Sequence, residues 1–515
     1  MKTSAYDVIV VGAGSAGCAL VGQLCQSPGL AVCLVEAGPD YGSFRSGRWP
    51  EELLSIQQLP ETHDWGYNEE RTGFSSPEAR AKVVGGCSTH NQCGAFWGLP
   101  DDYDAWAAAG NPGWSYANLT PLLEQIEQTS PEARSAYRGT SGVIETRPYR
   151  VDELASWQRL VLEAGQAAGL PRLTDLSAPE PAEGGAPFHA NIKGTIRWNA
   201  AFAFLDPVRT HPGLTILSNT MAERLVLHHT TAVSLICHTQ GNRLELRASR
   251  FVLCCGTYGT PLLLMRSGIG PAQNLQELGI LPLLDIPGVG QNLHDHPGIS
   301  MDFEPSALAQ RLLEEDLTHQ RFFQSQVVLR AKSRQCSTGF DLHLVPYQSR
   351  KDGQEASFSI LLFHLAPRSR GQVLLRGKEV HLPPKIDFRF FTDPGKQDAS
   401  AVMDGLDLIR RLVHVEPLAN AVKRETEPGQ RVRTVRDLGE YAHTHLISYR
   451  HASGTCKMGP PSDPTAVVDS SGQVYGTQNI FVADASLMPR IPRAPTNFTC
   501  FLIGLHIADL LSKKM

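Results

Sequence analysis

The amino-terminal stretch Tyr6-Asp-Val-Ile-Val-Val-Gly-Ala-Gly-Ser-Ala-Gly17 decides the fold of this 515-residue chain. An apolar run enters a Gly-x-Gly-x-x-Gly sequence, apolar side chains continue at helical spacing to Leu24, and a second apolar run ends at Glu36. A strand, a glycine turn, a helix and a second strand form a βαβ unit. In such a unit the glycines allow a tight turn, close approach to a pyrophosphate and close packing of the helix on the strand.

The acid that ends the second strand indicates the kind of nucleotide. Glu36 lies 24 residues after Gly12, where a carboxylate can accept a hydrogen bond from a ribose hydroxyl. Because a carboxylate disfavours a 2′-phosphate, the stretch predicts a site for an ADP moiety and not for NADP. The alternative is a glycine-rich turn without a ligand, which the flanking strands and helix disfavour.

Composition is that of an ordinary globular protein. The chain has 42% hydrophobic and 19% charged residues and a formal net charge of -5, which makes nucleic acid an unexpected partner. Its length favours two domains. We find no secretory leader and no run of about eighteen apolar residues, so we expect no membrane segment and a cytoplasmic protein. The eleven scattered cysteines, without Cys-x-x-Cys, are interpreted as reduced thiols.

The rest of the chain alternates between two kinds of pattern. Residues 250–270 predict a buried strand, a glycine turn and a helix started by Pro261, and residues 480–485 and 497–511 predict a further strand and a closing helix. Residues 101–128 look helical, whereas residues 39–76 show little periodicity and are expected to form a surface loop or lid. Residues 298–448 mix strand-like alternation with helices, as in an α+β region built on a sheet.

Two further segments carry candidate chemistry. Gly85-Gly86 is followed by Cys87-Ser-Thr-His90-Asn91, and the backbone N–H groups of such a loop can approach a second part of a cofactor. On chemistry alone, His90 is interpreted as an ordinary surface or core imidazole. The pair His294-x-His296 has no third ligand at useful spacing, so no metal site is predicted.

Five segments together resemble the glucose-methanol-choline (GMC) oxidoreductases, FAD enzymes that oxidise alcohols, and the similarity runs essentially end to end. These segments are the amino-terminal fingerprint, Gly85-Gly-Cys-Ser88, Gly256 to Gly270, His451-Ala-Ser-Gly-Thr-Cys-Lys-Met-Gly459, and Val482 to Pro489 with Asn497-x-Thr499.

The resemblance implies an α/β fold, in which a doubly wound, Rossmann-type FAD-binding domain carries an inserted α+β substrate domain built on an antiparallel sheet. We assign residues 1–148, 193–297 and 449–515 to the FAD-binding domain and residues 149–192 and 298–448 to the substrate domain.

The resemblance also assigns roles residue by residue. His451 is implied as the active-site base, and Asn497 occupies the second catalytic position, which is His or Asn in this family. The ADP half of FAD is implied to bind Gly12, Gly14, Gly17 and Glu36, with Ala222 near the adenine and Asp484 and Ala485 by the pyrophosphate and ribityl chain. The remaining predicted cofactor-binding residues are Ser15, Ala16, Ala37, Lys82, Gly85, Gly86, Cys87, His90, Asn91 and Thr499.

The segment from Ala79 to Asn91 is especially similar to the choline oxidase branch of the family, in which the corresponding histidine is bonded covalently to the flavin. His90 is therefore a candidate for a flavin linkage, with a noncovalent cradle as the alternative.

Three departures from that branch bear on the substrate and acceptor. Gly298 stands where the branch has a glutamate that contacts a quaternary ammonium, and a buried cation without its charge partner is costly, so choline is disfavoured. Tyr449 and Arg450 precede His451 where the branch has a tyrosine and a valine linked to oxygen reactivity, which leaves oxidase and dehydrogenase open. His343 matches a further active-site histidine only after a register shift.

The expected reaction removes a proton from the alcohol oxygen and a hydride from its carbon. His451 is expected to take the proton, Asn497 to orient the alcohol and stabilise the alkoxide, and flavin N5 to receive the hydride. Oxygen or another acceptor would then reoxidise the flavin. A lyase of the hydroxynitrile lyase type, without net redox, and a noncatalytic flavin-binding protein are the alternatives; the alcohol is left open, as is the oligomeric state, with a homodimer as one option.

Overall fold

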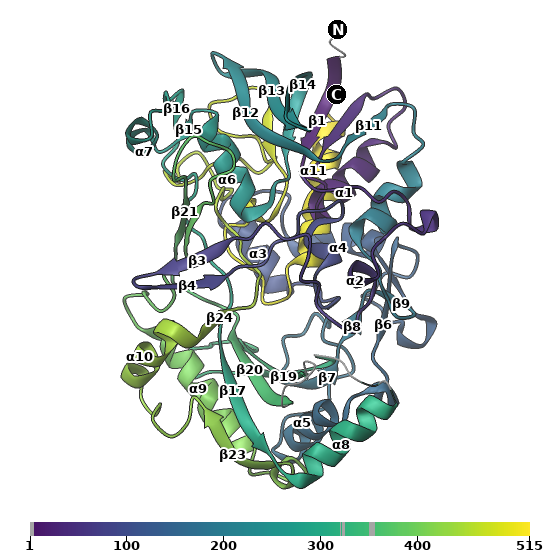
Figure 1. Ribbon diagram of the computed structural model, residues 1–515, viewed down its shortest axis with the longest axis vertical. Helices are drawn as coiled ribbons and strands as arrows, with labels where there is room; N and C mark the ends of the chain where they lie inside the picture. Colours follow the sequence, from purple (N-terminus) through teal and green to yellow (C-terminus); the bar gives the residue numbers. More distant parts are fainter. Residues whose placement is uncertain (1–4, 320, 322–324, 350–355, 515) are drawn as a thin grey trace.

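The computed structural model describes residues 5–319, 321, 325–349 and 356–514, so the ends of the predicted domain ranges at residues 1–4 and 515 lie outside it. Two large sheets organise the molecule, a mainly parallel sheet in the upper half of Figure 1 and an antiparallel sheet in the lower half. This architecture confirms the predicted α/β class, with a Rossmann-type domain joined to an α+β domain on an antiparallel sheet.

The first sheet is built on the predicted βαβ unit. Its central strand β1 (Ala5–Val11) pairs in parallel with β2 (Val32–Val35) and β14 (Asn242–Leu253), and β11 (Leu214–Leu217) and β25 (Ile480–Val482) extend the parallel part. Residues 8–11 are almost fully buried, which explains their unbroken apolar run, since parallel strands are covered on both faces. The covering helices α1 (Ser15–Leu24) and α11 (Asn497–Ser512) pack closely against each other.

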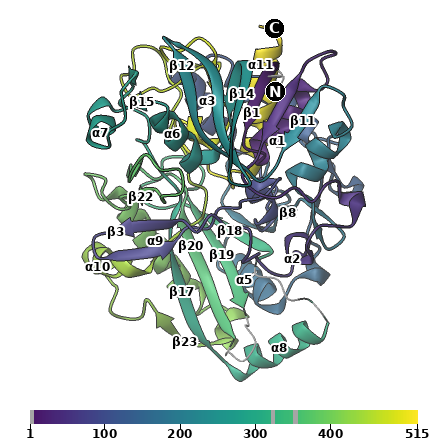
Figure 2. The same ribbon diagram turned by 45° about the horizontal axis from the view of Figure 1, so that its top comes forward.

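The long strand β14 joins two parts of this sheet. Residues 242–246 pair antiparallel with β13 (Thr231–Thr239), which pairs with β12 (Thr220–His228), whereas residues 247–253 pair in parallel with β1. The three antiparallel strands stand beside β1 in both ribbon views (Figures 1 and 2).

Helix α6 (Gly256–Arg266) follows β14 as expected, but the prediction that Pro261 starts this helix is wrong. The helix begins at Gly256 and contains Pro261. Proline has no N–H to give to the carbonyl of Thr257. That carbonyl instead accepts a hydrogen bond from Thr455 Oγ1 at 2.5 Å, and this bond lets the helix continue through the proline.

The second sheet has the strand order β23-β17-β20-β19-β18-β7, with β24 also paired to β17, and every pairing is antiparallel. Its strands are β7 (Gly184–Pro187), β17 (Pro297–Pro305), β18 (Val327–Ala331), β19 (Leu342–Ser349), β20 (Ser357–His364), β23 (Val422–Glu427) and β24 (Leu446–Ser448). The helices α5 (Ser156–Ala167) and α9 (Gln397–Leu412) cover one face of this sheet, where Gly185 and Leu329 meet α5 and Leu362 meets α9.

Each sheet has its own hydrophobic core. The core of the parallel sheet also takes in Val373, Ile386 and Phe388, from the range predicted for the substrate domain, and the other core takes in Phe96 and Ala494 from the range predicted for the FAD-binding domain. The domain boundaries therefore stay a prediction.

Two local predictions are corrected by the structure. The stretch predicted as a loop or lid contains the hairpin β3 (Asn68–Arg71) and β4 (Phe74–Pro77), which joins β21 (Gln372–Leu374) and β22 (Lys385–Asp387) in a four-stranded sheet. The predicted helix over 101–128 is two helices, α3 (Pro100–Ala108) and α4 (Tyr116–Ile126), because Gly110, Pro112 and Gly113 interrupt it. Among the described residues, we find no helix with the length and apolarity needed to cross a membrane.

Candidate active site

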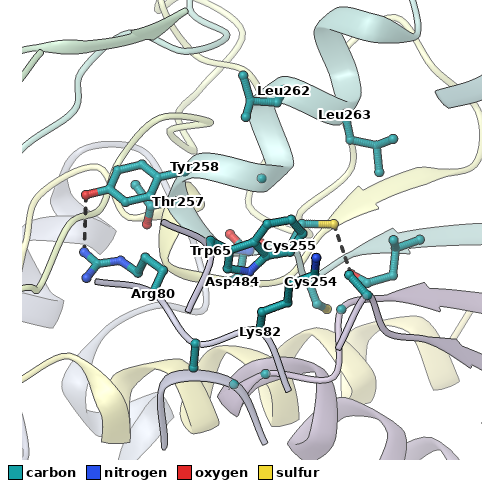
Figure 3. Close-up of a pocket in the computed structure, with 18 of the residues that line it drawn as sticks. Trp65, Arg80, Lys82, Cys254, Cys255, Thr257, Tyr258, Leu262, Leu263 and Asp484 are labelled. Atoms are coloured by element: carbon teal, nitrogen blue, oxygen red, sulfur yellow. Dashed lines mark hydrogen bonds between the residues drawn. The ribbon is translucent and has the colours of Figure 1, made fainter. Parts of the chain in front are cut away.

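The carboxyl ends of four neighbouring parallel strands meet at one cavity of about 430 Å³. Strands β2, β1, β14 and β25 end just before Glu36, Gly12, Cys254 and Asp484, and all four residues line the cavity. Ligands of open α/β sheets bind at this edge of the sheet. Figure 3 shows the cavity wall with Cys254, Cys255 and Asp484 on one side and the start of α6 above them.

Backbone approach in this cavity requires glycine. Gly12 has φ +103°, and a Cβ there would lie 2.3 Å from the carbonyl oxygen of Cys254. A Cβ on Gly86, which has φ +54°, would lie 2.5 Å from Cα of Gly14. The Gly85-Gly86 loop is therefore in contact with the amino-terminal glycine loop, and both loops present backbone to the same cavity beside the first turn of α1.

The Glu36 carboxylate is buried and oriented by backbone groups. Its Oε2 accepts a hydrogen bond from the Ala13 N–H and its Oε1 accepts one from the Gly38 N–H, both at 2.8 Å. Burial raises its pKa, which the two N–H groups and Lys82 partly oppose. Each oxygen keeps a further lone pair, which a ribose hydroxyl can use.

Charged and aromatic side chains form much of the remaining wall. The Lys82 ammonium lies 4.8 Å from the ring centre of Trp65. Arg80 pairs with Glu78 at 2.8 Å, and Figure 3 shows its hydrogen bond to the Tyr258 hydroxyl, at 3.3 Å. Trp65, Tyr258 and the segment 380–384 also line the cavity but were not predicted, because their sequence carries no nucleotide-binding pattern.

Most predicted cofactor-binding residues line this cavity. They are Gly12, Gly14, Ser15, Ala16, Glu36, Ala37, Lys82, Gly86, Cys87, Ala222, Asp484 and Ala485. Among the described residues that line it, we do not find Gly17, Gly85, His90, Asn91, Thr499, His451 or Asn497. Their immediate neighbours Arg450, Ala452, Thr496 and Cys500 do line it, so His451 and Asn497 lie just beside the cavity.

Several of these other residues have structural contacts of their own. Gly17 packs so closely that a Cβ would lie 1.9 Å from the Gly12 carbonyl oxygen. Thr499 Oγ1 lies 2.9 Å from the Tyr103 hydroxyl, and Asn91 Oδ1 accepts a hydrogen bond from the Cys93 N–H at 3.0 Å.

Asp295 fixes the backbone that carries His451. Its Oδ1 accepts hydrogen bonds from the backbone N–H groups of His451 (3.0 Å) and His296 (2.6 Å), and its Oδ2 accepts one from the Ser448 hydroxyl (2.7 Å). The start of α6 holds the next residue, since Thr257 Oγ1 donates to the Ala452 carbonyl at 2.7 Å. This role of Asp295 was not predicted, because the sequence of this segment was considered only for metal binding by His294 and His296.

The His451 ring contacts a second buried histidine. Nδ1 of His451 and Nδ1 of His296 lie 3.0 Å apart, with the two rings nearly perpendicular at 88°. Burial lowers the pKa of His451 to about 3, with a smaller contribution from Arg80, and burial also lowers that of His296. Both rings are therefore neutral at pH 7, and a hydrogen bond between them needs one Nδ1 protonated and the other free.

Asp295, His296 and His451 form the one group of potential metal ligands among the described residues. Ligand atoms of Asp295, His296 and His451 lie within 4.8 Å of one another. The Asp295 carboxylate already accepts three hydrogen bonds, and Nδ1 of His296 contacts Nδ1 of His451. These atoms therefore have partners without a metal. His294 is not part of the group, because its Nε2 accepts from the Ile491 N–H.

Asn497 begins α11 and is bonded to the first residue of α1. Ser15 Oγ donates to Asn497 Oδ1 at 2.8 Å, whereas Asn497 Nδ2 is buried and has no partner within the described residues. The Ser15 hydroxyl therefore orients the amide of Asn497, and Nδ2 is left as a free donor.

His90 ends the turn that carries the second glycine loop. Its Nε2 is buried without a partner in the described part of the chain, and burial lowers its pKa to about 4, with a further contribution from Arg197. Arg197 donates to the carbonyls of Thr89 and Asn91, at 2.9 Å each, and so holds the peptides on both sides of His90.

Gly298 lies in β17 opposite Phe363 of β20. A Cβ at position 298 would lie 2.4 Å from the Phe363 ring, which stacks on Tyr449 with ring centres 3.7 Å apart. The ring centres of Tyr449 and His451 in turn lie 4.4 Å apart. An aromatic wall therefore fills the space that a glutamate at 298 would need.

The residues present fit FAD. A Cβ on Gly12 or Gly86 would clash within the glycine cradle, Glu36 has lone pairs for a ribose, and His90 Nε2 and Asn497 Nδ2 are buried polar atoms without partners within the described residues.

Comparison with known proteins agrees with this site. Models of the amino- and carboxyl-terminal parts of the GMC oxidoreductases match residues 6–298 and 367–504. Choline oxidase of Arthrobacter globiformis is 33% identical over 98% of this chain and 94% of that enzyme, and oxygen-dependent choline dehydrogenase of Brucella anthropi is 30% identical over 98% and 95%. The crystal structure of pyridoxine 4-oxidase from Mesorbium loti has a TM-score of 0.87, at 28% identity and 99% coverage of both chains.

These relatives are oxidoreductases by name, and none supports the lyase alternative. The chain belongs to the GMC oxidoreductase family and is an FAD-dependent alcohol oxidoreductase.

Proposed function

We propose that His451 is the general base of this alcohol oxidation and that Asn497 binds the substrate oxygen beside it. The observation that carries the proposal is the 3.0 Å contact between Nδ1 of His451 and Nδ1 of His296, in a ring that burial keeps neutral. A neutral imidazole accepts a proton only at a nitrogen that carries none.

The contact with His296 determines which nitrogen is the base. When His451 Nδ1–H donates to His296 Nδ1, Nε2 of His451 is left unprotonated and takes the hydroxyl proton. His296 is then a positioning residue that selects the tautomer, and Asp295 holds the backbone of both histidines through their N–H groups.

Asn497 supplies a free donor. Ser15 donates to its Oδ1, which orients the amide, and the unpartnered Nδ2 donates to the substrate oxygen and stabilises the negative charge that develops there when His451 removes the proton. When bound, FAD supplies the acceptor for the hydride of the substrate carbon.

The acceptor that reoxidises the enzyme is oxygen or another electron carrier. The relatives favour oxygen, because one is named an oxidase and the dehydrogenase is named as oxygen-dependent. Choline, on which these relatives act by name, is a poor candidate substrate, because Phe363 and Tyr449 occupy the space of a carboxylate at position 298.

We also propose that His90 is linked covalently to the flavin. A link through Nε2 would use a buried nitrogen without a partner in the described part of the chain. Burial and Arg197 lower the pKa of His90, so the ring is neutral at pH 7 and Nε2 can be free of a proton. A cytoplasmic location, supported by eleven free cysteines, and a homodimer stay predictions.

Anaerobic mixing of the flavin-loaded protein with a panel of primary alcohols tests the proposed function. We expect at least one alcohol to bleach the flavin absorbance with formation of its aldehyde, and His451→Gln to keep the flavin but lose the bleaching. Cleavage of a substrate without bleaching would instead support a lyase.

Acid precipitation tests the link to His90. We expect flavin absorbance to stay with the precipitated native protein and to move to the supernatant in His90→Ala. Release of flavin from the native protein would contradict the link and would mean that His90 contacts the flavin only noncovalently.

A further inference from the structure

One row of residues crosses the antiparallel sheet on the face opposite α5 and α9. Arg330 of β18 pairs with His343 of β19, His343 pairs with Phe363 of β20, and Phe363 pairs with Gly298 of β17. Directly paired residues point to the same face of a sheet. Since the neighbouring Leu329 and Leu362 meet the helices, this row faces the other way, toward the active site.

Ring contacts connect the row to the base. Phe363 stacks on Tyr449, His343 lies 6.3 Å from the Tyr449 ring, and Tyr449 lies 4.4 Å from the His451 ring. The ring of Tyr449 therefore lies between His343 and His451, and Arg330 is paired with His343 on the next strand.

Arg330 has too few partners for a buried cation. It is 1% exposed, donates one hydrogen bond to the Leu176 carbonyl and lies 4.2 Å from the Phe340 ring centre. Its Nε has no partner among the described residues. A guanidinium has five N–H donors, and leaving them unpaired in a buried site costs free energy.

The other buried arginines show what Arg330 lacks. Arg138 binds the carboxylates of Glu127 and Asp175, and Arg410 binds Glu425 at 2.9 Å. Arg197 has no carboxylate but donates to four backbone carbonyls. In the part of the chain that the structure describes, Arg330 is the buried arginine with neither arrangement.

The acids near Arg330 are already engaged. Asp175 accepts from both Nε and Nη2 of Arg138, at 2.6 and 2.7 Å, and Asp102 accepts from Nε of Arg493 at 2.8 Å. The neighbouring His343 also has free polar atoms, since both of its ring nitrogens are buried without partners within the described residues.

We infer that Arg330 and His343 bind a carboxylate of the substrate, so that this enzyme oxidises alcohols that carry a carboxylate group. The inference deepens the proposed function and rests on it. A guanidinium pairs with the two oxygens of a carboxylate, and the His343 N–H adds a donor beside it. The aromatic side chains Phe340, Phe363 and Tyr449 suit a flat spacer between the carboxylate and the hydroxymethyl group.

The same row would disfavour a cationic substrate. Arg330 repels an ammonium group, and Gly298, opposite Phe363, supplies no carboxylate to attract one. This sheet thus favours a negatively charged substrate, whereas an enzyme for a quaternary ammonium alcohol favours a positively charged one.

Binding of unreactive ligands tests the inference without turnover. We would titrate the flavin-loaded protein with 4-methylbenzoate and with 4-methylbenzamide by calorimetry. These ligands have nearly the same shape and differ in charge. We expect the benzoate to bind roughly 10- to 100-fold more tightly than the amide, the range of a charged hydrogen-bonded pair.

Variants assign the difference to Arg330. Arg330→Met should remove the preference for benzoate, and Arg330→Lys should retain part of it, with flavin content and melting temperature reported for both. Arg410→Met is the matched control, because it removes a buried arginine of the same domain and should keep the preference. Equal binding of both ligands to the native protein, or a preference that survives in folded Arg330→Met, would overturn the inference.

A reactive pair separates this inference from the proposed function. 4-(Hydroxymethyl)benzoate should bleach the flavin at lower concentrations than 4-(hydroxymethyl)benzamide, and Arg330→Met should abolish that difference. If neither alcohol bleaches the flavin but benzoate still binds through Arg330, the carboxylate site stands and alcohol oxidation fails. If both alcohols bleach it equally and bind equally, alcohol oxidation stands and the carboxylate site fails.

Discussion

The edge of the parallel sheet and the face of the antiparallel sheet build their binding surfaces in different ways. At the edge, the cavity is shaped by backbone, since glycines at 12 and 86 admit close approach and N–H groups orient Glu36. On the face, the surface consists of side chains, in a row that runs from Arg330 to Gly298 across four strands.

This difference separates cofactor from substrate. A backbone surface depends on glycine at a few positions in short sequence patterns, and it suits a ligand shared by a whole family. A row of side chains can be changed one residue at a time without altering the strands, so it suits selection among alcohols.

Gly12→Ala should have the largest effect on the first region. The new Cβ would lie 2.3 Å from the Cys254 carbonyl, at a φ of +103° that alanine disfavours, so we expect nearly complete loss of bound flavin. Gly439→Ala in α10 (Val435–His445) is the control, because no atom lies within 4 Å of its Cβ. Flavin absorbance per protein measures both, and full flavin in Gly12→Ala would contradict the backbone cradle.

His296→Ala should have the next largest effect, on the reaction and not on cofactor binding. Without His296, the His451 ring loses the partner that selects its tautomer, and we expect anaerobic flavin reduction to slow by roughly 10- to 100-fold. Stopped-flow absorbance measures the rate. His296→Gln, which can still accept from Nδ1–H, should recover part of it, and an unchanged rate in His296→Ala would remove this positioning role.

Gly298→Ala should act on stability through Phe363. A Cβ 2.4 Å from the Phe363 ring forces that ring to move, at a cost of about 1–3 kcal/mol. In the Phe363→Leu background the same change should cost less, because the ring is absent. The free energy of unfolding of the native protein, the two single variants and the double variant measures this coupling, and equal costs in both backgrounds would exclude the contact.

Acidification should produce a graded effect on stability. Burial lowers the pKa of His189 and His451 to about 3 and that of His90 and His506 to about 4. The same histidines take up protons in the unfolded chain below about pH 6.5. Their contribution to the free energy of unfolding is therefore fully present above that pH and is lost as the pH drops toward their pKa values in the folded protein. Each histidine contributes roughly 1.4 kcal/mol per pH unit in this window.

The contribution of one histidine can be isolated at His506, which packs against Trp114 with ring centres 4.5 Å apart. We expect the melting temperature of His506→Gln to fall less between pH 7 and pH 5 than that of the native protein. An identical fall in both proteins would show that His506 does not stay neutral in the folded state.

The contrast between the two regions also explains what could be predicted from the sequence. Gly12, Glu36 and Asp484 lie in short segments with a fixed local pattern, and the fold they indicated is confirmed. Asp295 and His296 were given no role in the reaction, because their partner His451 lies over 150 residues later, and the pairing of β17 with β24 and of His294 with Ser453 brings the segments together.

Arg330 could not be singled out from the sequence at all. It lies in the run Val327–Ala331, whose other residues are apolar, and its significance comes from its pairing with His343 and from the absence of a carboxylate partner within the described residues. Both are properties of strand register, which a local pattern does not determine.

The central claim is that His451 removes the hydroxyl proton, and the rate of anaerobic flavin reduction in His451→Ala tests it most directly. The account predicts a limiting rate lower by roughly 10²- to 10⁴-fold, with flavin content and melting temperature close to the native values. A flavin-loaded His451→Ala that is reduced by its alcohol at a rate within a few-fold of the native protein would contradict the account.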